Sequence, residues 1–258
     1  KKNNLPLKGI AESNIRRQLK RLRDLMIIEK NSNVYYLSEF EPLDRIFEEK
    51  IDISHLEVQE RNLGDKGIIL VDTEDPICAV AGLFSMEDFT IFAFTEQDLC
   101  HKLLEKHARY IHKRTEAVAR KFPGRLWRIY GPEYATEPFL PVPFFEEYVV
   151  RYTGPMVKMI KDHGGYVRLH SHGRVKDVLS YMVKMGADAT DPLEPYPHGN
   201  ADLKVVREKY GKDLVLFGNI EVADIENIEP EKFREVVRKA IADGTFGEGR
   251  GFVLMPTA

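Results

Sequence analysis

The sequence has few cysteines, no long apolar run and no excess of basic charge. Only two cysteines, Cys78 and Cys100, occur among the 258 residues, and neither stands in a CxxC pattern. They are too few for a disulfide framework or a typical zinc site, so we expect both to be small buried apolar residues. The 38 basic and 41 acidic side chains give a net charge of −3, which argues against nucleic acid as the principal partner.

Membrane and secretion signals are also missing from the sequence. No run approaches the roughly 18 apolar residues of a transmembrane helix. The polar residues 1–4 are not followed by the apolar core of a signal peptide. We therefore expect a cytoplasmic protein without a membrane partner.

Two nucleotide-binding signatures are absent as well. Open nucleotide-binding sheets carry a glycine-rich turn directly after a strand, and P-loop proteins carry a Gly, Lys and Ser/Thr signature. The only glycine-rich stretch, residues 244–251, precedes a predicted strand, so we interpret it as a loop.

From residue 64 onward, short apolar runs alternate with longer amphipathic segments. Helix starts are marked by Asp75 with Pro76 and by Glu229 with Pro230, and apolar residues recur at helical spacing over 145–156. The runs of strand length are, in order, 67–71, 126–130, 166–170, 187–190, 214–217 and 252–255. Connections of this length imply parallel strands with helical crossovers. An open doubly wound sheet and a (β/α)8 barrel both fit, and the strand spacing of about 20 to 40 residues favours the barrel.

The ends of the chain look different from its middle. Residues 1–63 are predicted to be mainly helical, with a basic amphipathic helix over 11–29 and a possible seventh strand at 34–37. No helix is predicted after the last strand. We therefore expect one (β/α)8 TIM barrel domain over residues 1–258 that is incomplete, with its N-terminal strands and its final helix missing from this chain.

Two histidines stand at the predicted end of the third strand, where barrel enzymes place their chemistry. His170 and His172 are two residues apart, so on an extended strand both imidazoles project to the same side and can bind one ion. Glu133 or Glu194 could supply a third ligand of an open divalent metal site, with zinc the first choice. We predict His170, His172 and Glu133 as catalytic residues. Hydrogen-bonded histidines without a metal are the alternative.

Four other residues near these strand ends are predicted to bind substrate. They are Arg168, Glu194, Tyr196 and Asn219. Arg168 lies on the same strand face as His170, and a structural ion pair is the alternative role for it. Asn219 could equally be a turn residue that satisfies backbone groups. Arg174 and Arg250 are further cations considered for holding a substrate carboxylate.

Five motifs follow one another in the second half of the chain. They are residues 144–148 with Pro155, 169–175, 191–195, 202–211 and 216–221. In this order they resemble the uroporphyrinogen decarboxylase superfamily, and specifically its cobamide-dependent methyltransferase branch. The resemblance implies a (β/α)8 barrel, in agreement with the strand count. The arginine-rich N-terminal motif of the decarboxylases themselves is not visible here.

The resemblance also implies a metal site that this sequence alters. The methyltransferase branch has H-x-C-G at the third strand listed above, with the His and Cys binding zinc and a second Cys after the last strand. Here the first position is His170, the Cys position is His172, and Thr257 and Ala258 follow the last strand without a cysteine. Two imidazoles with a carboxylate would leave a harder, more Lewis-acidic metal than thiolates do.

The activity implied by the resemblance is methyl transfer. A methyl group would move between a small methylated substrate or a methyl-corrinoid and an acceptor, with the corrinoid (cobalamin) carried by a separate partner protein. Two alternatives stay open. One is a decarboxylase that acts on a carboxylated substrate, and the other is a non-catalytic barrel that binds a corrinoid or a partner.

Overall fold

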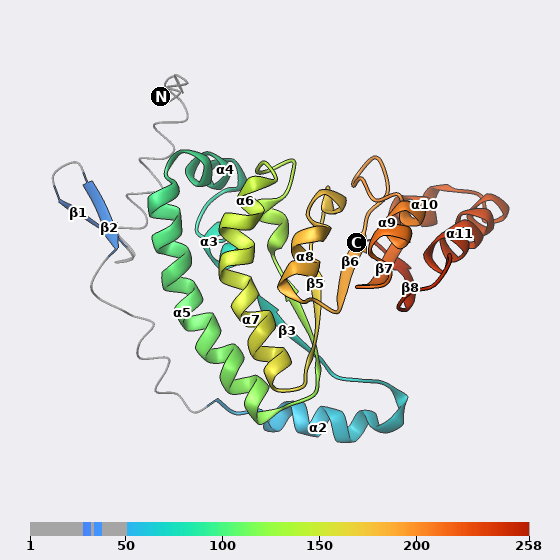
Figure 1. Ribbon diagram of the computed structural model, residues 1–258, viewed down its shortest axis with the longest axis horizontal. Coiled ribbons are helices and arrows are strands. Elements are labelled where there is room, and N and C mark those ends of the chain that lie inside the picture. The colour runs from blue at the N-terminus through green and yellow to red at the C-terminus, as the bar shows by residue number, and fades with distance from the viewer. Residues whose placement is uncertain (1–27, 32–33, 38–50, 258) are drawn as a thin grey trace.

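The computed structural model describes residues 28–31, 34–37 and 51–257. Within the last range, six parallel strands form one sheet whose spatial order follows the sequence (Figure 1). They are β3 (Leu70–Glu74), β4 (Leu126–Tyr130), β5 (Tyr166–His170), β6 (Ala189–Leu193), β7 (Val215–Ile220) and β8 (Phe252–Pro256). Helices connect each strand to the next, which is the arrangement of a partial (β/α)8 barrel.

The helices begin where the sequence marks their first turns. The α-helices are α2 (Ser54–Leu63), α3 (Pro76–Ala81), α4 (Met86–Thr95), α5 (Gln97–Lys121), α6 (Pro143–Phe145), α7 (Arg151–Asp162), α8 (Leu179–Met185), α9 (Leu203–Tyr210), α10 (Val222–Asn227) and α11 (Pro230–Gly244). Short 3-10 turns are η2 (Gly64–Lys66), η3 (Pro132–Ala135) and η5 (Val175–Asp177), and η4 (Glu146–Val150) is a π-helical turn. α3 confirms its predicted start, because Asp75 Oδ1 accepts a hydrogen bond from Cys78 N at 2.8 Å. None of the helices in the described ranges is long and apolar enough to cross a membrane.

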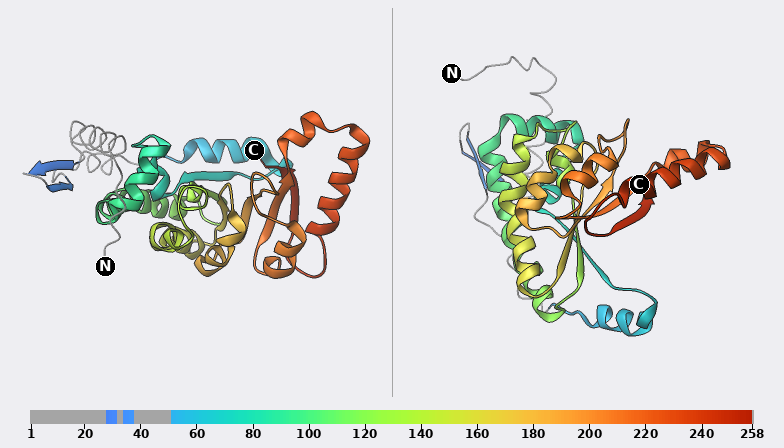
Figure 2. Two further views of the ribbon diagram at one scale, coloured as in Figure 1. Left: turned by 90° about the horizontal axis from the view of Figure 1, so that it is seen from above. Right: turned by 45° about the vertical axis from the view of Figure 1, so that its right-hand side comes forward.

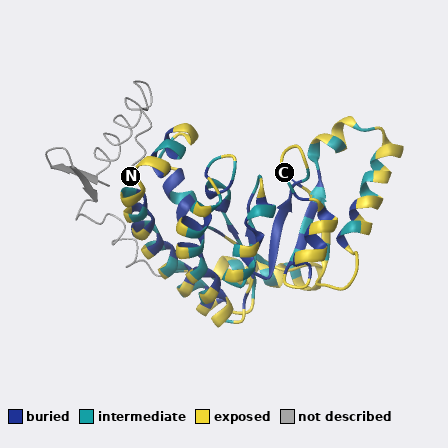
Figure 3. Ribbon diagram, turned by 45° about the horizontal axis from the view of Figure 1, so that its top comes forward, coloured by how far each residue is buried: buried dark blue, intermediate teal, exposed yellow. Residues whose placement is uncertain are grey.

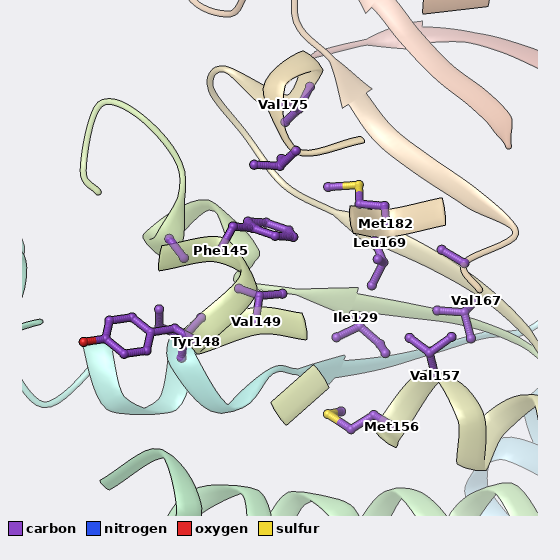
Figure 4. Close-up of a cluster of buried hydrophobic side chains, with 14 of the residues drawn as sticks. Ile129, Phe145, Tyr148, Val149, Met156, Val157, Val167, Leu169, Val175 and Met182 are labelled. Atoms are coloured by element: carbon purple, nitrogen blue, oxygen red, sulfur yellow. The ribbon is translucent and has the colours of Figure 1, made fainter. Parts of the chain in front are cut away.

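The helices cover one face of the sheet with an apolar core. Along β4 and β5 every second side chain is buried, and Ile129, Val167 and Leu169 are fully covered. Figure 4 shows these side chains beside those of η4, α7 and α8, among them Tyr148 and Met156. Figure 3 shows the central strands of the sheet as mainly buried and the outward sides of the helices as exposed. The alternate side chains of the strands therefore point to the other, inner face of the sheet.

Two groups of helices lie at opposite ends of the sheet. α5 and α7 run side by side next to the β3 to β5 end, whereas α11 packs against β7 and β8 (Figures 1 and 2). The six strand predictions are confirmed in number and order, and the bounds of β4 and β5 are those predicted. β3 begins and ends three residues later than predicted, and β6 and β7 each end three residues later. The residues at these ends, among them Asp72, Asp191 and Asn219, continue the ladder.

The predictions for the first 50 residues need a correction. The predicted strand at 34–37 exists as β2 (Val34–Leu37), but it pairs antiparallel with β1 (Ile28–Asn31) in a separate two-stranded sheet. It is therefore not a seventh strand of the parallel sheet. Of the helix predicted over 11–29, residues 11–27 lie outside the described residues, and residues 28 and 29 belong to β1.

Candidate active site

A row of polar side chains crosses the carboxyl edge of the sheet. The strand register places Glu74, Tyr130, His170 and Asp191 directly beside one another on β3, β4, β5 and β6. Their neighbours Thr73, Ile129 and Leu169 are buried on the helix-covered face, so the row lies on the inner face. Asp191 was predicted to follow its strand, and its place within β6 is what brings it next to His170.

Asp191 holds two of the predicted site residues. Its side chain is 1% exposed, and its Oδ2 lies 2.9 Å from Nδ1 of His170. Its Oδ1 lies 3.0 Å from Nε of Arg168, whose guanidinium also stacks over the ring of Phe217 at 4.9 Å from the centroid. Arg168 thus has an internal partner, which is the ion-pair alternative that the sequence left open. The aspartate fixes the orientation of the His170 ring and leaves its Nε2 for other contacts.

A second carboxylate and imidazole pair follows the strands. His172 lies beyond the end of β5, and its Nδ1 is 2.9 Å from Oε1 of Glu194. The other oxygen of Glu194 accepts a hydrogen bond from Gly173 N. The hydrogen bond that His172 donates to Glu194 raises the pKa of His172 against the opposing effect of burial. Burial acts to raise the pKa of Glu194, but the hydrogen bonds from His172 and Gly173 outweigh it and lower that pKa.

We expect Glu194→Gln to lower the pKa of His172, because the mutation removes the charged partner of its ring. The raised pKa contributes stability that is fully present below the pKa of an unfolded histidine, about 6.5. This stability is lost as the pH rises through the folded-state pKa. An NMR titration of the histidine ring protons measures the shift. Glu116→Gln is the matched control, since Glu116 pairs with a different histidine, His163, at 2.8 Å; that variant should leave the pKa of His172 unchanged.

Two carboxyl groups at this end of the sheet, Glu133 and Asp75, have raised pKa values, which favour the neutral carboxylic acids. Glu133 lies in η3, directly after β4, and its Oε2 is buried without a hydrogen-bond partner among the described residues. Burial raises the pKa of Glu133, and the nearby His170 and His172 only partly oppose this. Asp75 is fully buried, accepts hydrogen bonds from Cys78 N and Thr153 Oγ1, and has a pKa well above its usual value because of burial.

Both cysteines lack the character of metal ligands. Burial and the neighbouring carboxyl groups raise the pKa of the Cys78 thiol to about 12. Cys100 is fully buried on α5, and burial raises its pKa to about 12 as well. Without a metal ion, both thiols therefore stay protonated at neutral pH. The prediction of burial holds for Cys100, whereas Cys78 is only partly buried.

The predicted metal site meets a geometric difficulty. The rings of His170 and His172 are close, with centroids 4.8 Å apart, and a carboxylate on Nδ1 is typical of metal-binding histidines. However, no three His, Cys, Asp or Glu side chains within the described ranges form a group that could hold a metal ion. Glu194 contacts Nδ1 of His172, so it orients this ring instead of supplying the third ligand. The residues therefore do not fit the zinc site that the resemblance implies.

The other two predicted substrate-binding residues lie in a separate cavity. A cavity of about 790 Å³ is bounded by the loop after β6, the end of β7, α10 and α11, and Tyr196 and Asn219 line it. Tyr196 is 87% exposed, and Nδ2 of Asn219 donates to Leu193 O at 2.8 Å. The predicted residues thus form two groups. One is the histidine cluster, consisting of Glu133, Arg168, His170, His172, Asp191 and Glu194, and the other is this side cavity.

Two residues of the edge row had no assigned role in the sequence. Tyr130 donates a hydrogen bond to Glu74 at 3.4 Å, and Glu74 forms an ion pair with Arg114 at 2.8 Å. The sequence signal for them is position alone, because Tyr130 ends the apolar run 126–130 and Glu74 follows the run 67–71 by three residues. Arg250 does not belong here, because it precedes β8 and donates to Asp188 O at the opposite edge of the sheet.

A family model matches most of the chain. The model of the family described as Uroporphyrinogen decarboxylase (URO-D) matches residues 57–258, which is well over half of the chain. No curated protein matches the sequence. The matched range begins in α2 and contains the whole parallel sheet and the histidine cluster.

Proposed function

Since the chain belongs to the uroporphyrinogen decarboxylase family, we propose that it is an enzyme of the methyltransferase-like kind. It would move a methyl group between a small methylated substrate or a methyl-corrinoid and an acceptor at the histidine cluster. The corrinoid, bound to a partner protein, would carry the methyl group. Because the residues do not fit a zinc site, the roles that we assign to this chain are proton transfer and orientation.

The proposal rests on two imidazole rings whose Nδ1 atoms are each hydrogen-bonded to a carboxylate. Asp191 fixes His170 and Glu194 fixes His172, and neither Nε2 has a hydrogen bond within the part of the chain described. An imidazole oriented in this way by a carboxylate is a suitable general acid or base near neutral pH. His170 would accept the proton of an acceptor X–H as the bond between X and the methyl carbon forms. The electron pair of the broken bond stays with the methyl carrier.

His172 and Glu133 are suited to the reverse proton movement. The hydrogen bond to Glu194 favours the protonated form of His172, and burial favours the neutral carboxylic acid of Glu133. Both groups can therefore donate a proton when a methylated substrate loses its methyl group and its leaving atom gains charge. The cluster thus pairs one group suited to accept a proton with two suited to donate one.

Decarboxylation is the second candidate, because the family description names it. A substrate with carboxylate groups needs free cationic side chains in the site. The arginines form ion pairs instead: Arg168 with Asp191, Arg128 with Asp72, and Arg174 with Glu137. These pairs neutralise the arginines of the inner face and the adjoining loop, and so they favour methyl transfer over decarboxylation.

A spectroscopic assay separates the candidates. The protein is incubated with methylcobalamin and a panel of thiol acceptors, and the change in the corrinoid absorption spectrum reports demethylation. We expect turnover with at least one acceptor. Carbon dioxide release from porphyrinogens without corrinoid turnover would support a decarboxylase instead. Cobalamin binding with neither reaction would support a non-catalytic barrel.

A further inference from the structure

The side cavity has an excess of negative charge. Its lining contains four carboxylates, from Asp202, Glu221, Asp224 and Asp243, and one ammonium group, from Lys239. Lys239 pairs with Asp243, and the Asp202 carboxylate caps α9 by accepting from Val205 N at 3.1 Å. Glu221 and Asp224 are therefore left as the carboxylates that can meet a ligand.

Only one of the two carboxylate oxygens of Glu221 has a partner among the described residues. Its side chain is 12% exposed, and its Oε2 lies 3.0 Å from Nδ1 of His198. Its Oε1 is buried and has no hydrogen-bond partner among the described residues. Burying an unpaired carboxylate oxygen is costly, and such an atom in a native site calls for an ion, a water or a ligand nearby. Asp224 lies one helical turn further along α10 and lines the same cavity.

The rest of the wall suits an organic cation better than a metal ion. Its apolar and aromatic surface comes from Pro195, Tyr196, Val236 and Ala240. The carboxylates do not converge, since no group of three potential metal ligands exists in the described ranges. A methylated ammonium group spreads its charge over several carbons, and it binds between aromatic rings and carboxylates without close coordination. The cavity volume of about 790 Å³ also lies within the usual range for small-ligand sites.

We propose that the side cavity binds a small organic cation, with Glu221 and Asp224 as its counter-charges and Tyr196 as its aromatic wall. This inference rests on the proposed function, in which a methylated ammonium compound would be the methyl donor. The wall of the cavity begins at Pro195, directly after Glu194 of the histidine cluster, and Asn219 of this wall donates to Leu193 O in β6.

Calorimetric titration of the full chain with choline tests the proposal. The neutral isostere 3,3-dimethylbutan-1-ol has the same shape without the charge. We expect choline to bind and the isostere to bind at least about tenfold more weakly, since a charged partner is lost. Glu221→Gln and Asp224→Asn should each weaken choline binding about tenfold, and Tyr196→Ala should weaken it several-fold. Glu231→Gln on α11, outside the cavity lining, removes the same charge and should leave binding unchanged.

Three outcomes would overturn the proposal. They are equal affinity for choline and its isostere, an equal effect of Glu231→Gln, or tighter binding of Mg²⁺ or Mn²⁺ that displaces choline. Asp224→Asn keeps the test valid if Glu221→Gln unfolds, because Asp224 makes no side-chain hydrogen bond within the described ranges. Binding is measured without a corrinoid. Choline binding without methyl transfer would therefore contradict the proposed function alone, and methyl transfer without choline binding would contradict this inference alone.

Discussion

Replacing His170 with alanine should lower the rate of methyl transfer by about 10² to 10⁴, the usual contribution of a general acid or base. His170 is the imidazole that the buried Asp191 orients at 2.9 Å, and its side chain is 15% exposed at the carboxyl edge of the sheet. Without it, no oriented base accepts the acceptor proton as the new bond forms. The measurement is the rate of methylcobalamin demethylation at a saturating acceptor concentration.

The controls for this prediction separate chemistry from folding. His163→Ala removes an imidazole that pairs with Glu116 just after α7, away from the histidine cluster, and should leave the rate unchanged. His170→Gln keeps a polar side chain of similar size and should be as slow as the alanine variant while keeping the native circular dichroism. An unchanged rate in both His170 variants would show that His170 is not the base.

A variant of Asp191 provides a second readout of the same site. Asp191→Asn keeps the shape of the side chain but removes the charged partner of His170 Nδ1. We expect a lower maximal rate per folded molecule in this variant, because no carboxylate holds the His170 ring. A purely structural role of Asp191 would lower the amount of folded enzyme and leave the rate per folded molecule unchanged.

The sequence was sufficient for the order of the strands but not for their ends. β5 alternates apolar and polar residues along its whole length and β4 does so from Trp127 onward, and the bounds of both strands were predicted correctly. Four polar residues were instead predicted to follow their strands, because polar side chains are unusual in buried strands. These residues are Asp72, Glu74, Asp191 and Asn219. They fit because each faces the inner side and finds a partner on another element, for example Arg128 for Asp72.

The composition of the candidate site was predictable, whereas its internal pairing was not. The positions of His170, His172 and Glu133 after strand-like runs placed them at one edge of the sheet. Which carboxylate binds which imidazole depends on the cross-strand register, and spacing along the chain does not determine that register. For the same reason Glu194, expected to be a ligand or substrate contact, was not recognised as the residue that orients His172.

Replacing Asp191 with alanine should have the largest effect on stability, lowering the free energy of unfolding by about 3–5 kcal/mol. The mutation removes the partner of Arg168, whose side chain is 12% exposed, and leaves a buried guanidinium without its counter-charge. It also removes the hydrogen-bond partner of His170 Nδ1. Urea unfolding followed by circular dichroism measures the change, as a lower midpoint with an unchanged slope.

Asp72→Ala is the matched control for this effect. Asp72 forms the corresponding ion pair with Arg128 on the same face of the sheet, but the two side chains are 44% and 31% exposed. Solvent screens such a pair, so its loss should cost only about 0–1 kcal/mol. The double variant Asp191→Ala with Arg168→Met should recover part of the lost stability, because no unpaired charge remains in it. If Asp191→Ala costs no more than Asp72→Ala, burial does not strengthen the Arg168 and Asp191 pair, and Asp191 is not the central support of the histidine cluster.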